Sequence, residues 1–600
     1  MDLCVRSISV NTSKLPHGDL RFGKLFSILK KRIEARCCAV CSENDVSASY
    51  EITFKLDSTV PAEGFCLETQ NHPVGIVISG TDFLSLMYGA GQLLHKSRYT
   101  KEGFIPTHWR GQSVPQSTKR MIFFAQHFHN WYQRCMTEEI REHIEDLTLW
   151  GINGVVTVFS CLNLKGWDDP NLGDLVALFR KTLHTARELG LKIGIEYSNV
   201  DFMVPQLDIR ADKKYLLSQT GNLVCPSTEK RFAYYQQMLS RILDYTDEFG
   251  GLDFITLWSY DEGGCCCDQC WPWGGKGFYN MAHKISRYIK GRYPNIEIWL
   301  ATWYLGRRPE QAEEWPMLYR RLQEDASMGD NWVDYLLLET RDDYPAVFFP
   351  VEHGQPTAHT KLLTFPDVSM TGITPWGGFG AICTPRMMRR QEEPFAKHCD
   401  GGYLYTEGFF DDINKVYNLS LYWDRSRSDE EILTDYCGYE YRGIQPEDFI
   451  KLIEKIESGH LCTNRFDRKP ANLAVCDAAW ELAQKMDESA APETKNYWRW
   501  RILYIRAYLD QVRYHRCADQ GWPLRKTPSG WMHFWRKFLE HDQKAQEYLL
   551  ELIHLYKAHE VDDTDRYAYH WYVRPPMTFG ADLEFERRVT ETMMQIKGVI

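Results

Sequence analysis

The sequence Leu252-Asp-Phe-Ile-Thr-Leu-Trp-Ser-Tyr-Asp-Glu-Gly-Gly-Cys-Cys-Cys-Asp-Gln-Cys-Trp-Pro-Trp-Gly274 opens with an apolar run and continues into acidic, glycine, cysteine and tryptophan residues. The run over 252–256 has the length and composition of a β-strand, and residues 278–293 have the apolar spacing of a helix. A strand that ends in acidic residues, followed by a loop and a helix, is how a (β/α)-barrel carries functional groups at its C-terminal face. The stretch therefore predicts one unit of such a barrel.

Strand–helix alternation of this kind continues on both sides of that stretch, which is typical of a parallel sheet. Strands are predicted at 120–125, 154–160, 191–197, 254–259, 297–303, 333–339, 362–365 and 402–406. Helices are predicted between them at 138–149, 172–189, 230–249, 278–293, 310–324 and 386–397. Residues 341–360, with several prolines, are predicted as an irregular loop. The fold class is therefore α/β, with a (β/α)₈ TIM barrel over residues 113–427.

Two smaller domains are predicted to flank the barrel. Residues 1–112 alternate between helix and strand, with Asp82 placed to cap a helix, and predict a small α/β domain. Residues 428–600 have helical apolar spacing and predict a helical domain. Its helices are expected at 430–436, 446–458, 472–487, 495–512 and 531–559.

Composition excludes several classes of function. The formal net charge of −11 leaves no basic stripe to neutralise phosphates, so no nucleic acid partner is expected. No apolar run is long enough to cross a membrane, so no membrane partner is expected. Residues 1–10 lack the basic and apolar segments of a secretory signal, so the 18 cysteines are expected to be reduced thiols in the cytoplasm. A homo-oligomer stays open.

The carboxylate pair Asp261-Glu262 lies among aromatic residues, with Trp258 before it and Trp271 after it. Cleavage of a glycosidic bond needs a carboxyl group that is held protonated to donate to the leaving oxygen. Aromatic rings supply flat apolar faces for a pyranose. The stretch therefore predicts a glycoside hydrolase that acts on an oligosaccharide or a glycoconjugate.

The small domain carries a family resemblance. Residues 50–99, with Gly75-Ile-Val-Ile-Ser-Gly-Thr-Asp82 and Leu86-Met-Tyr-Gly-Ala-Gly-Gln-Leu-Leu94, resemble the domain that precedes the barrel in bacterial β-N-acetylhexosaminidases of glycoside hydrolase family 20. A similar domain precedes the barrel in the family 67 α-glucuronidases. The place of Asp261-Glu262 after the fourth strand is also similar to the family 20 Asp-Glu motif.

The sequence also departs from both families. In family 20, glycines precede the Asp-Glu pair, whereas here Trp258-Ser-Tyr260 precedes it and the glycines follow. The context Tyr260-Asp-Glu-Gly-Gly264 is closer to the acid-bearing loop of family 67. The cysteine cluster fits neither pattern. We therefore place the chain among related barrels and in neither family.

Glu262 is the predicted general acid, because burial among tryptophans raises the pKa of a carboxyl group. The family 20 resemblance implies that Asp261 orients a 2-acetamido group, whose carbonyl then attacks the anomeric carbon. The alternative is that Asp261 only holds Glu262 in place. A substrate without that acetamido group needs a second carboxylate from another strand, and Glu339 and Asp367 are the candidates.

Substrate-binding residues are predicted at other strand ends. Arg120, at the start of the first strand, is predicted to bind sugar because a guanidinium group can hold hydroxyls by charge-assisted hydrogen bonds. The other predicted substrate-binding residues are aromatic or acidic: Trp258, Trp303, Trp376, Tyr405 and Glu407.

Cys265, Cys267 and Cys270 have the spacing Cys-x-Cys-x₂-Cys, which is typical of zinc ligands. Cys225 is a possible remote partner for them. Catalysis by carboxylates needs no cofactor, so any zinc is expected to be structural. A chain without metal stays open.

The leading hypothesis is a hydrolase similar to the β-N-acetylhexosaminidases. An inverting hydrolase similar to the α-glucuronidases and a non-catalytic carbohydrate-binding barrel are the alternatives, and a zinc hydrolase that uses the cysteine loop is a further one.

Overall fold

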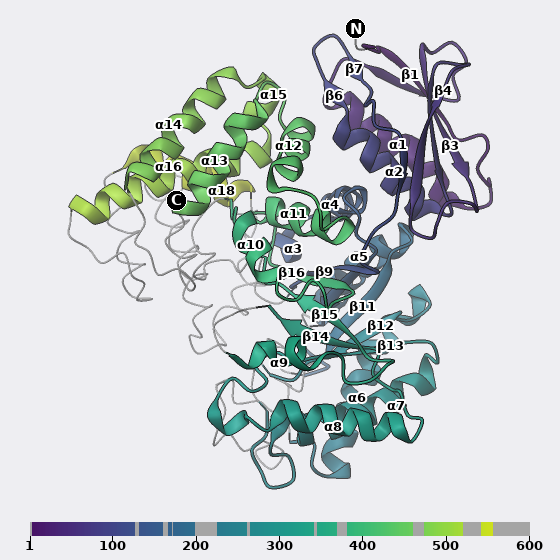
Figure 1. Ribbon diagram of the computed structural model, residues 1–600, viewed down its shortest axis with the longest axis vertical. Helices are drawn as coiled ribbons and strands as arrows, with labels where there is room; N and C mark the ends of the chain where they lie inside the picture. The colour runs from purple at the N-terminus through teal and green to yellow at the C-terminus, as the bar shows by residue number, and fades with distance from the viewer. Residues whose placement is uncertain are drawn as a thin grey trace.

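The computed structural model contains a sheet domain, a closed barrel and a group of helices (Figure 1). It describes residues 3–126, 131–159, 166–170, 172–197, 225–260, 264–340, 345–368, 381–459, 473–519 and 542–555. Within this part of the chain, no helix combines the length and the apolar character needed to cross a lipid bilayer. The boundaries near residues 112 and 427 stay a prediction.

The N-terminal domain is a six-stranded sheet with strand order β2-β1-β3-β5-β4-β8. Strands β1, β2, β3 and β5 are parallel to one another, whereas β4 runs antiparallel to its neighbours β5 and β8. Its strands are β1 (Ser7–Asn11), β2 (Val40–Glu43), β3 (Tyr50–Leu56), β4 (Phe65–Gln70), β5 (Gly75–Gly80) and β8 (Gly111–Ser113). A short ribbon is formed by β6 (Arg98–Tyr99) and β7 (Phe104–Ile105).

Two helices, α1 (Leu20–Glu34) and α2 (Phe83–Lys96), accompany this sheet. The Asp82 side chain caps α2 by accepting a hydrogen bond of 2.8 Å from the amide of Ser85, as the sequence predicts. Both helices bury an apolar face, and their buried residues belong to one hydrophobic cluster that continues into the barrel.

Eight parallel strands close into the barrel, and β16 completes it by pairing with β9. The predicted barrel is therefore confirmed, with every strand at its predicted place. The strands are β9 (Lys119–Phe124), β10 (Gly154–Val158), β11 (Lys192–Tyr197), β12 (Phe254–Leu257), β13 (Glu297–Ala301), β14 (Tyr335–Glu339), β15 (Lys361–Phe365) and β16 (Gly401–Thr406).

Aromatic rings fill the barrel. Phe254 and Trp299 stack with ring centroids 4.0 Å apart, and Tyr403 lies 6.1 Å from Trp299. All three residues are buried. Since side chains occupy the interior, the barrel is a packed core, and any cleft must be built by the loops at its ends.

Helices surround the barrel: α3 (Trp131–Arg134), α4 (Thr137–Leu149), α5 (Leu172–Glu188), α6 (Glu229–Asp244), α7 (Tyr279–Arg292), α8 (Glu314–Ser327), α9 (Phe349–His353), α10 (Pro385–Glu392) and α11 (Asp412–Trp423). The predicted irregular segment between strands six and seven contains a 3₁₀ turn, Pro345–Phe348, and the five-residue α9. Helix α11 was not predicted. Its residues are buried on every side, so it lacks the apolar stripe by which a surface helix is found.

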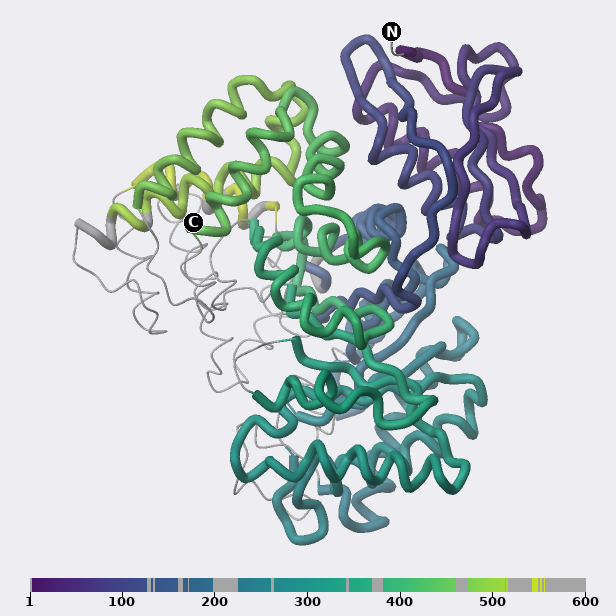
Figure 2. The backbone as a smooth tube through the Cα atoms, viewed as in Figure 1, coloured from purple at the N-terminus to yellow at the C-terminus, as the bar shows by residue number. Residues whose placement is uncertain are grey.

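The C-terminal helices are α12 (Asp429–Glu440), α13 (Pro446–Gly459), α14 (Leu473–Ser489), α15 (Pro492–Lys495), α16 (Trp498–Asp519) and α18 (Gln543–Leu555). Of the predicted helix at 531–559, only residues 542–555 lie in the described part. Figure 2 shows these helices and the N-terminal domain beside each other, away from α6, α7 and α8. Helices α2 and α12 are in contact.

The N-terminal domain also contacts the barrel directly. Gly91 of α2 packs on the backbone of Leu149 in α4, where an added Cβ would lie 2.0 Å from the Leu149 carbonyl oxygen. The Tyr88 hydroxyl donates a hydrogen bond of 2.9 Å to the carbonyl of Ile152. Because Gly91 has no side chain, the backbones of α2 and α4 can approach each other closely.

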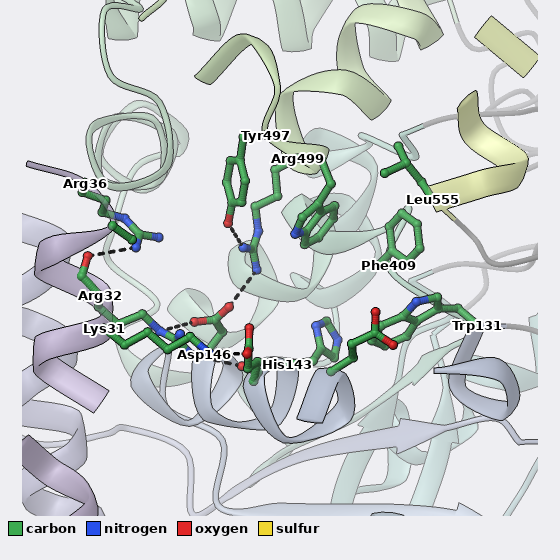
Figure 3. Close-up of a pocket in the computed structure, with 14 residues that line it drawn as sticks. Lys31, Arg32, Arg36, Trp131, His143, Asp146, Phe409, Tyr497, Arg499 and Leu555 are labelled. Carbon is green, nitrogen blue, oxygen red and sulfur yellow. Dashed lines mark hydrogen bonds and ion pairs between the residues drawn. The ribbon is translucent and has the colours of Figure 1, made fainter. Parts of the chain in front are cut away.

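Charged residues from all three parts meet beside a cavity of about 390 Å³ (Figure 3). Asp146 of α4 lies 2.9 Å from Arg32 of α1 and 3.2 Å from Arg499 of α16. Arg499 also pairs with Asp412 at 2.7 Å. Burial opposes ionisation of Asp146, but the charges of Arg32, Arg499 and Arg36 outweigh it and hold the pKa of Asp146 below its ordinary value. This ion-pair network links the three parts.

Candidate active site

The acid-bearing loop begins at the C-terminal end of β12. Trp258, Ser259 and Tyr260 follow the strand directly and are buried. Asp261 and Glu262, the next two residues, lie outside the described residues. Their predicted roles stay predictions, while the position of Tyr260 places the loop at the face expected for functional groups.

The loop returns through Trp273, whose indole N–H donates a hydrogen bond of 2.7 Å to the carbonyl of Ser259. Gly264 lies against this indole, and an added Cβ there would lie 2.2 Å from the ring. A π-helical turn, Trp273–Phe278, then leads into α7. Such turns are frequent at functional sites. The glycine and the tryptophan together close the loop tightly onto the end of β12.

Glu314, the first residue of α8, joins this loop to the loop after β13. Its carboxylate accepts hydrogen bonds from the Tyr260 hydroxyl and, at 3.1 Å, from the Gly274 amide. It also accepts from the Gly306 amide at 3.1 Å and from Gln311 at 3.3 Å. No sequence pattern singled out Glu314, since an acidic residue at a helix start is ordinarily a solvated one.

The environment of Glu314 changes its protonation. Burial raises its pKa to about 7, although the hydrogen bonds from Tyr260 and from the amides of Gly274 and Gly306 oppose the shift. Glu314 therefore changes charge near neutral pH while it holds Tyr260, the residue before Asp261.

Glu339 ends β14 and is buried, with 3% of its surface exposed. Its Oε2 lies 3.4 Å from the amide of Tyr304, at hydrogen-bond distance. Tyr304 has a φ of +64°, in the left-handed region, which costs a residue with a side chain about 1–2 kcal/mol. Strain of this kind concentrates at functional sites. Glu339 therefore lies where the sequence predicts, at the C-terminal end of its strand.

Asp367 and Glu407 follow β15 and β16, and both are buried. Asp367 pairs through its backbone with Tyr405, whose hydroxyl donates a hydrogen bond of 2.8 Å to Oε1 of Glu407. The structure thus brings Asp367, Tyr405 and Glu407 together at one end of the barrel.

Four aromatic rings cover the packed interior at this end. Phe365 lies at their centre, with ring centroids 5.1 Å from Trp258, 5.5 Å from Trp303 and 5.9 Å from Tyr405. Trp258 and Trp303 are only 7% and 6% exposed. We therefore regard these rings as the floor beneath the loops. Trp376 lies outside the described residues.

Arg120, which the sequence analysis predicts as a sugar-binding residue, does not belong to this group. It lies at the start of β9, at the opposite end of a parallel barrel. Its fully buried guanidinium donates to the carbonyls of Gly151 and Ser117 and, at 2.8 Å, to Glu63 of the N-terminal domain. Arg120 therefore anchors that domain to the barrel.

Glu196, near the end of β11, was missed by the sequence analysis. It lies near Tyr403 inside the barrel: burial raises the pKa of Tyr403 well above its ordinary value, and the charge of Glu196 adds to the shift. The signal that identified Glu339, an acidic residue at a strand end, is also present in Lys192-Ile-Gly-Ile-Glu-Tyr197.

The predicted cysteine ligands do come together, and Cys225 joins them. Residue Cys225 precedes α6, and the other three follow β12: Cys265, Cys267 and Cys270. The four sulfur atoms lie within 4.8 Å of one another. Cys266 is outside this group.

No protein-family model matches the chain, and no curated protein sequence does either. Several solved structures of glycoside hydrolases match it in fold. A family 115 4-O-methyl-α-glucuronidase with specificity for decorated arabinogalactans matches with a TM-score of 0.58 at 9% identity, over 94% of this chain and 78% of that one.

A family 89 enzyme from Clostridium perfringens, in complex with its substrate GlcNAc-α-1,4-galactose, matches with a TM-score of 0.58 at 12% identity. That match covers 89% of this chain and 65% of the other. A family 20 β-N-acetylhexosaminidase from Streptomyces coelicolor A3(2) matches with a TM-score of 0.48 at 13% identity, over 72% of this chain and 90% of that one. At such identities the first two matches show a shared fold, which is the predicted fold class.

Proposed function

We propose that the protein is a glycoside hydrolase that releases a terminal sugar from an oligosaccharide or a glycoconjugate. The observation that carries this proposal is the gathering of acidic residues at the C-terminal ends of several barrel strands, above an aromatic floor. Glu339, Asp367 and Glu407 form this group, and the pair Asp261-Glu262 follows Tyr260 directly in the sequence. Glycosidic cleavage needs such carboxyl groups on both sides of the scissile bond.

In the proposed reaction, Glu262 donates a proton to the glycosidic oxygen while the bond to the anomeric carbon breaks. With a 2-acetamido substrate, the acetamido carbonyl attacks that carbon and Asp261 orients the group. Water then opens the cyclic intermediate and returns a proton to Glu262. No cofactor takes part in these steps.

A second candidate is an inverting hydrolase of uronic acid sugars. In this case a carboxylate from another strand, Glu339 or Asp367, activates a water molecule on the face opposite Glu262. The burial of Glu339 and its contact with the strained Tyr304 favour a functional role for this residue. The family 115 and family 89 structures name these two substrate classes, a methylated glucuronide and a GlcNAc glycoside.

Substrate contacts are proposed for the residues at this end of the barrel. Trp258 and Trp303 form the floor, and Trp376 belongs to the following loops by its place in the sequence. The Tyr405–Glu407 pair offers a buried acceptor for sugar hydroxyls. A reducing, cytoplasmic location is part of the proposal, because no two cysteines within the described ranges are joined by a disulfide.

A screen of aryl glycosides and defined oligosaccharides tests the proposal, with the released sugar identified by mass spectrometry. We expect turnover of either 2-acetamido or uronic acid substrates, lost in Glu262→Gln and retained in the matched control Glu324→Gln, which changes an exposed residue of α8. Binding without turnover, at an affinity unaffected by Glu262→Gln, would instead support the non-catalytic barrel.

A further inference from the structure

Cysteines from two separate loops of the barrel form one cluster. We propose that Cys225, Cys265, Cys267 and Cys270 bind a single zinc ion as four thiolates. The ion would join the segment before α6 to the loop after β12. The metal site does not depend on the proposed hydrolase activity, because the four ligands are identified from the distances between their sulfur atoms.

The distances between the sulfur atoms fit a tetrahedral metal centre. The Sγ atom of Cys225 lies 3.8 Å from that of Cys267 and 3.8 Å from that of Cys270. Zinc–sulfur bonds of about 2.3 Å in a regular tetrahedron place the sulfur atoms about 3.8 Å apart. A disulfide would bring two of them to about 2.05 Å. The cluster therefore has the spacing of ligands around an ion.

The surroundings of the cluster also fit a structural site. Cys225, Cys265 and Cys270 are buried, with 2%, 0% and 1% of their surface exposed. Four protein ligands leave no coordination position for water, which distinguishes a structural zinc from a catalytic one. A zinc hydrolase needs such a position for its catalytic water, so a site with four cysteine ligands argues against that alternative.

The chain around the cluster is held in the shape of a ligand loop. The amides of Cys270 and Trp271 both donate hydrogen bonds of 2.9 Å to the carbonyl of Cys267, which turns the chain tightly between two of the ligands. Lys276 donates to the carbonyl of Asp268 and brings a positive charge beside the loop. Four thiolates and Zn²⁺ carry a net charge of about −2, so a nearby cation favours the metal-bound form.

Zinc is the metal that this ligand set selects. Thiolate ligands are soft, and a tetrahedral arrangement of four sulfur atoms is typical of zinc or of iron centres. Zinc needs no redox partner and no inorganic sulfide. Binding converts four thiols into thiolates and releases their protons to solvent.

The site has a consequence for the loop that carries the predicted acid. Cys265 comes three residues after Glu262 in the sequence, so one metal ligand fixes the chain just beyond Asp261-Glu262. Cys225 adds a connection to the neighbouring helix unit, since α6 and α7 are adjacent (Figure 1). The ion would therefore connect two consecutive units of the barrel at the face that carries the acidic residues.

Metal analysis of the full chain, purified under reducing conditions without a metal-affinity tag, tests the proposal. We expect about one zinc per chain. After exchange with Co²⁺, the visible spectrum should show the thiolate charge-transfer and d–d bands of a tetrahedral site. Protein that stays metal-free after incubation with excess zinc, protein that holds iron, or a disulfide among these cysteines would each overturn the assignment.

Variants then identify the ligands. Cys225→Ser and Cys270→Ser should lose most of the zinc, whereas Cys266→Ser, within the same run of cysteines but outside the cluster, should keep it. If the ligand variants fail to fold, wild-type protein is stripped with a chelator and titrated with zinc while its melting temperature is followed. Saturation at one equivalent with a rise in melting temperature supports the site, and no response contradicts it.

Discussion

The Tyr260 hydroxyl donates a hydrogen bond to the carboxylate of Glu314, although the two residues are 54 positions apart. Tyr260 is the last described residue before Asp261, and Glu314 begins the helix that follows the next strand. The same carboxylate also accepts from the amides of Gly274 and Gly306. One buried acidic residue thus fixes two neighbouring loops at the C-terminal face of the barrel.

Replacing Glu314 with glutamine should change the pH dependence of stability. The folded protein holds the pKa of Glu314 at about 7, above its ordinary value of 4.5. Between these values the unfolded chain has lost the proton and the folded chain retains it, so this group makes stability fall as pH rises from about 4.5 to about 7. Glu314→Gln should remove that part of the slope in urea unfolding measured across this range, and Glu324→Gln should leave it unchanged.

Glu314→Gln should also affect the reaction if the proposed function is right. The amide group cannot accept the hydrogen bonds that the carboxylate accepts on both oxygens, so the Tyr260 loop should shift. Misplacement of about 1 Å can cost about 10²-fold in rate. We expect kcat to fall toward that size while KM changes little. A variant with normal kcat would show that the loop holds its position without Glu314.

Replacement of the predicted acid gives the sharpest kinetic test. General acid catalysis typically contributes about 10²–10⁴-fold, so Glu262→Gln should slow hydrolysis of natural glycans by that order. The loss should be smaller for nitrophenyl glycosides, because their leaving group needs less protonation. Equal losses on both substrate types would point to a structural defect, and full activity on a natural glycan would remove the assignment.

Comparing three carboxylate variants separates the two substrate classes. If a 2-acetamido group supplies the nucleophile, Asp261→Asn should lower kcat strongly, and Glu339→Gln should act weakly. If water is activated instead, Glu339→Gln or Asp367→Asn should cost the larger factor. NMR of the first product anomer distinguishes retention from inversion.

Asp146→Asn should destabilise the folded chain. Asp146 is buried between Arg32 and Arg499, and removal of one charge from a buried pair typically costs about 3–5 kcal/mol. The pKa of Asp146 in the folded protein lies below its ordinary value, so the ionised carboxylate stabilises the fold at pH values above the unfolded pKa of about 3.9. This stabilisation is lost as the pH falls through the folded-state pKa.

Denaturant unfolding of Asp146→Asn at neutral and acidic pH measures this loss. The matched control is Lys451→Gln, which removes an exposed ion pair with Asp448 and should change stability by less than about 1 kcal/mol. Equal effects of the two substitutions would show that the network does not join the domains.

The regular parts of the fold were predictable because each strand carries its own pattern. The eight barrel strands are short apolar runs with helices between them, and the acid at the end of β14 follows from the same pattern. The fourth sulfur ligand was harder to assign. Cys225 lies 40 positions before Cys265, so only the tertiary fold shows that the two meet.

Other parts were not predictable for physical reasons. Glu314 begins an ordinary helix, and its burial arises from loops that are remote in sequence. Arg120 was predicted to contact substrate although it begins its strand, and its ion-pair partner Glu63, 57 positions earlier, could be identified only from the tertiary fold. Strand and helix periodicity reports on local structure, whereas these contacts belong to the assembled chain.

The backbone contact between Gly91 and Leu149 limits how the protein can move. A hinge motion between the small domain and the barrel would have to separate α2 from α4, whose backbones are in direct contact here. We therefore expect any opening and closing over a ligand to take place within the barrel loops, while α2 stays packed on α4. Substituting Gly91 with even an alanine would push α2 and α4 apart, so the position of the small domain against the barrel depends on this glycine.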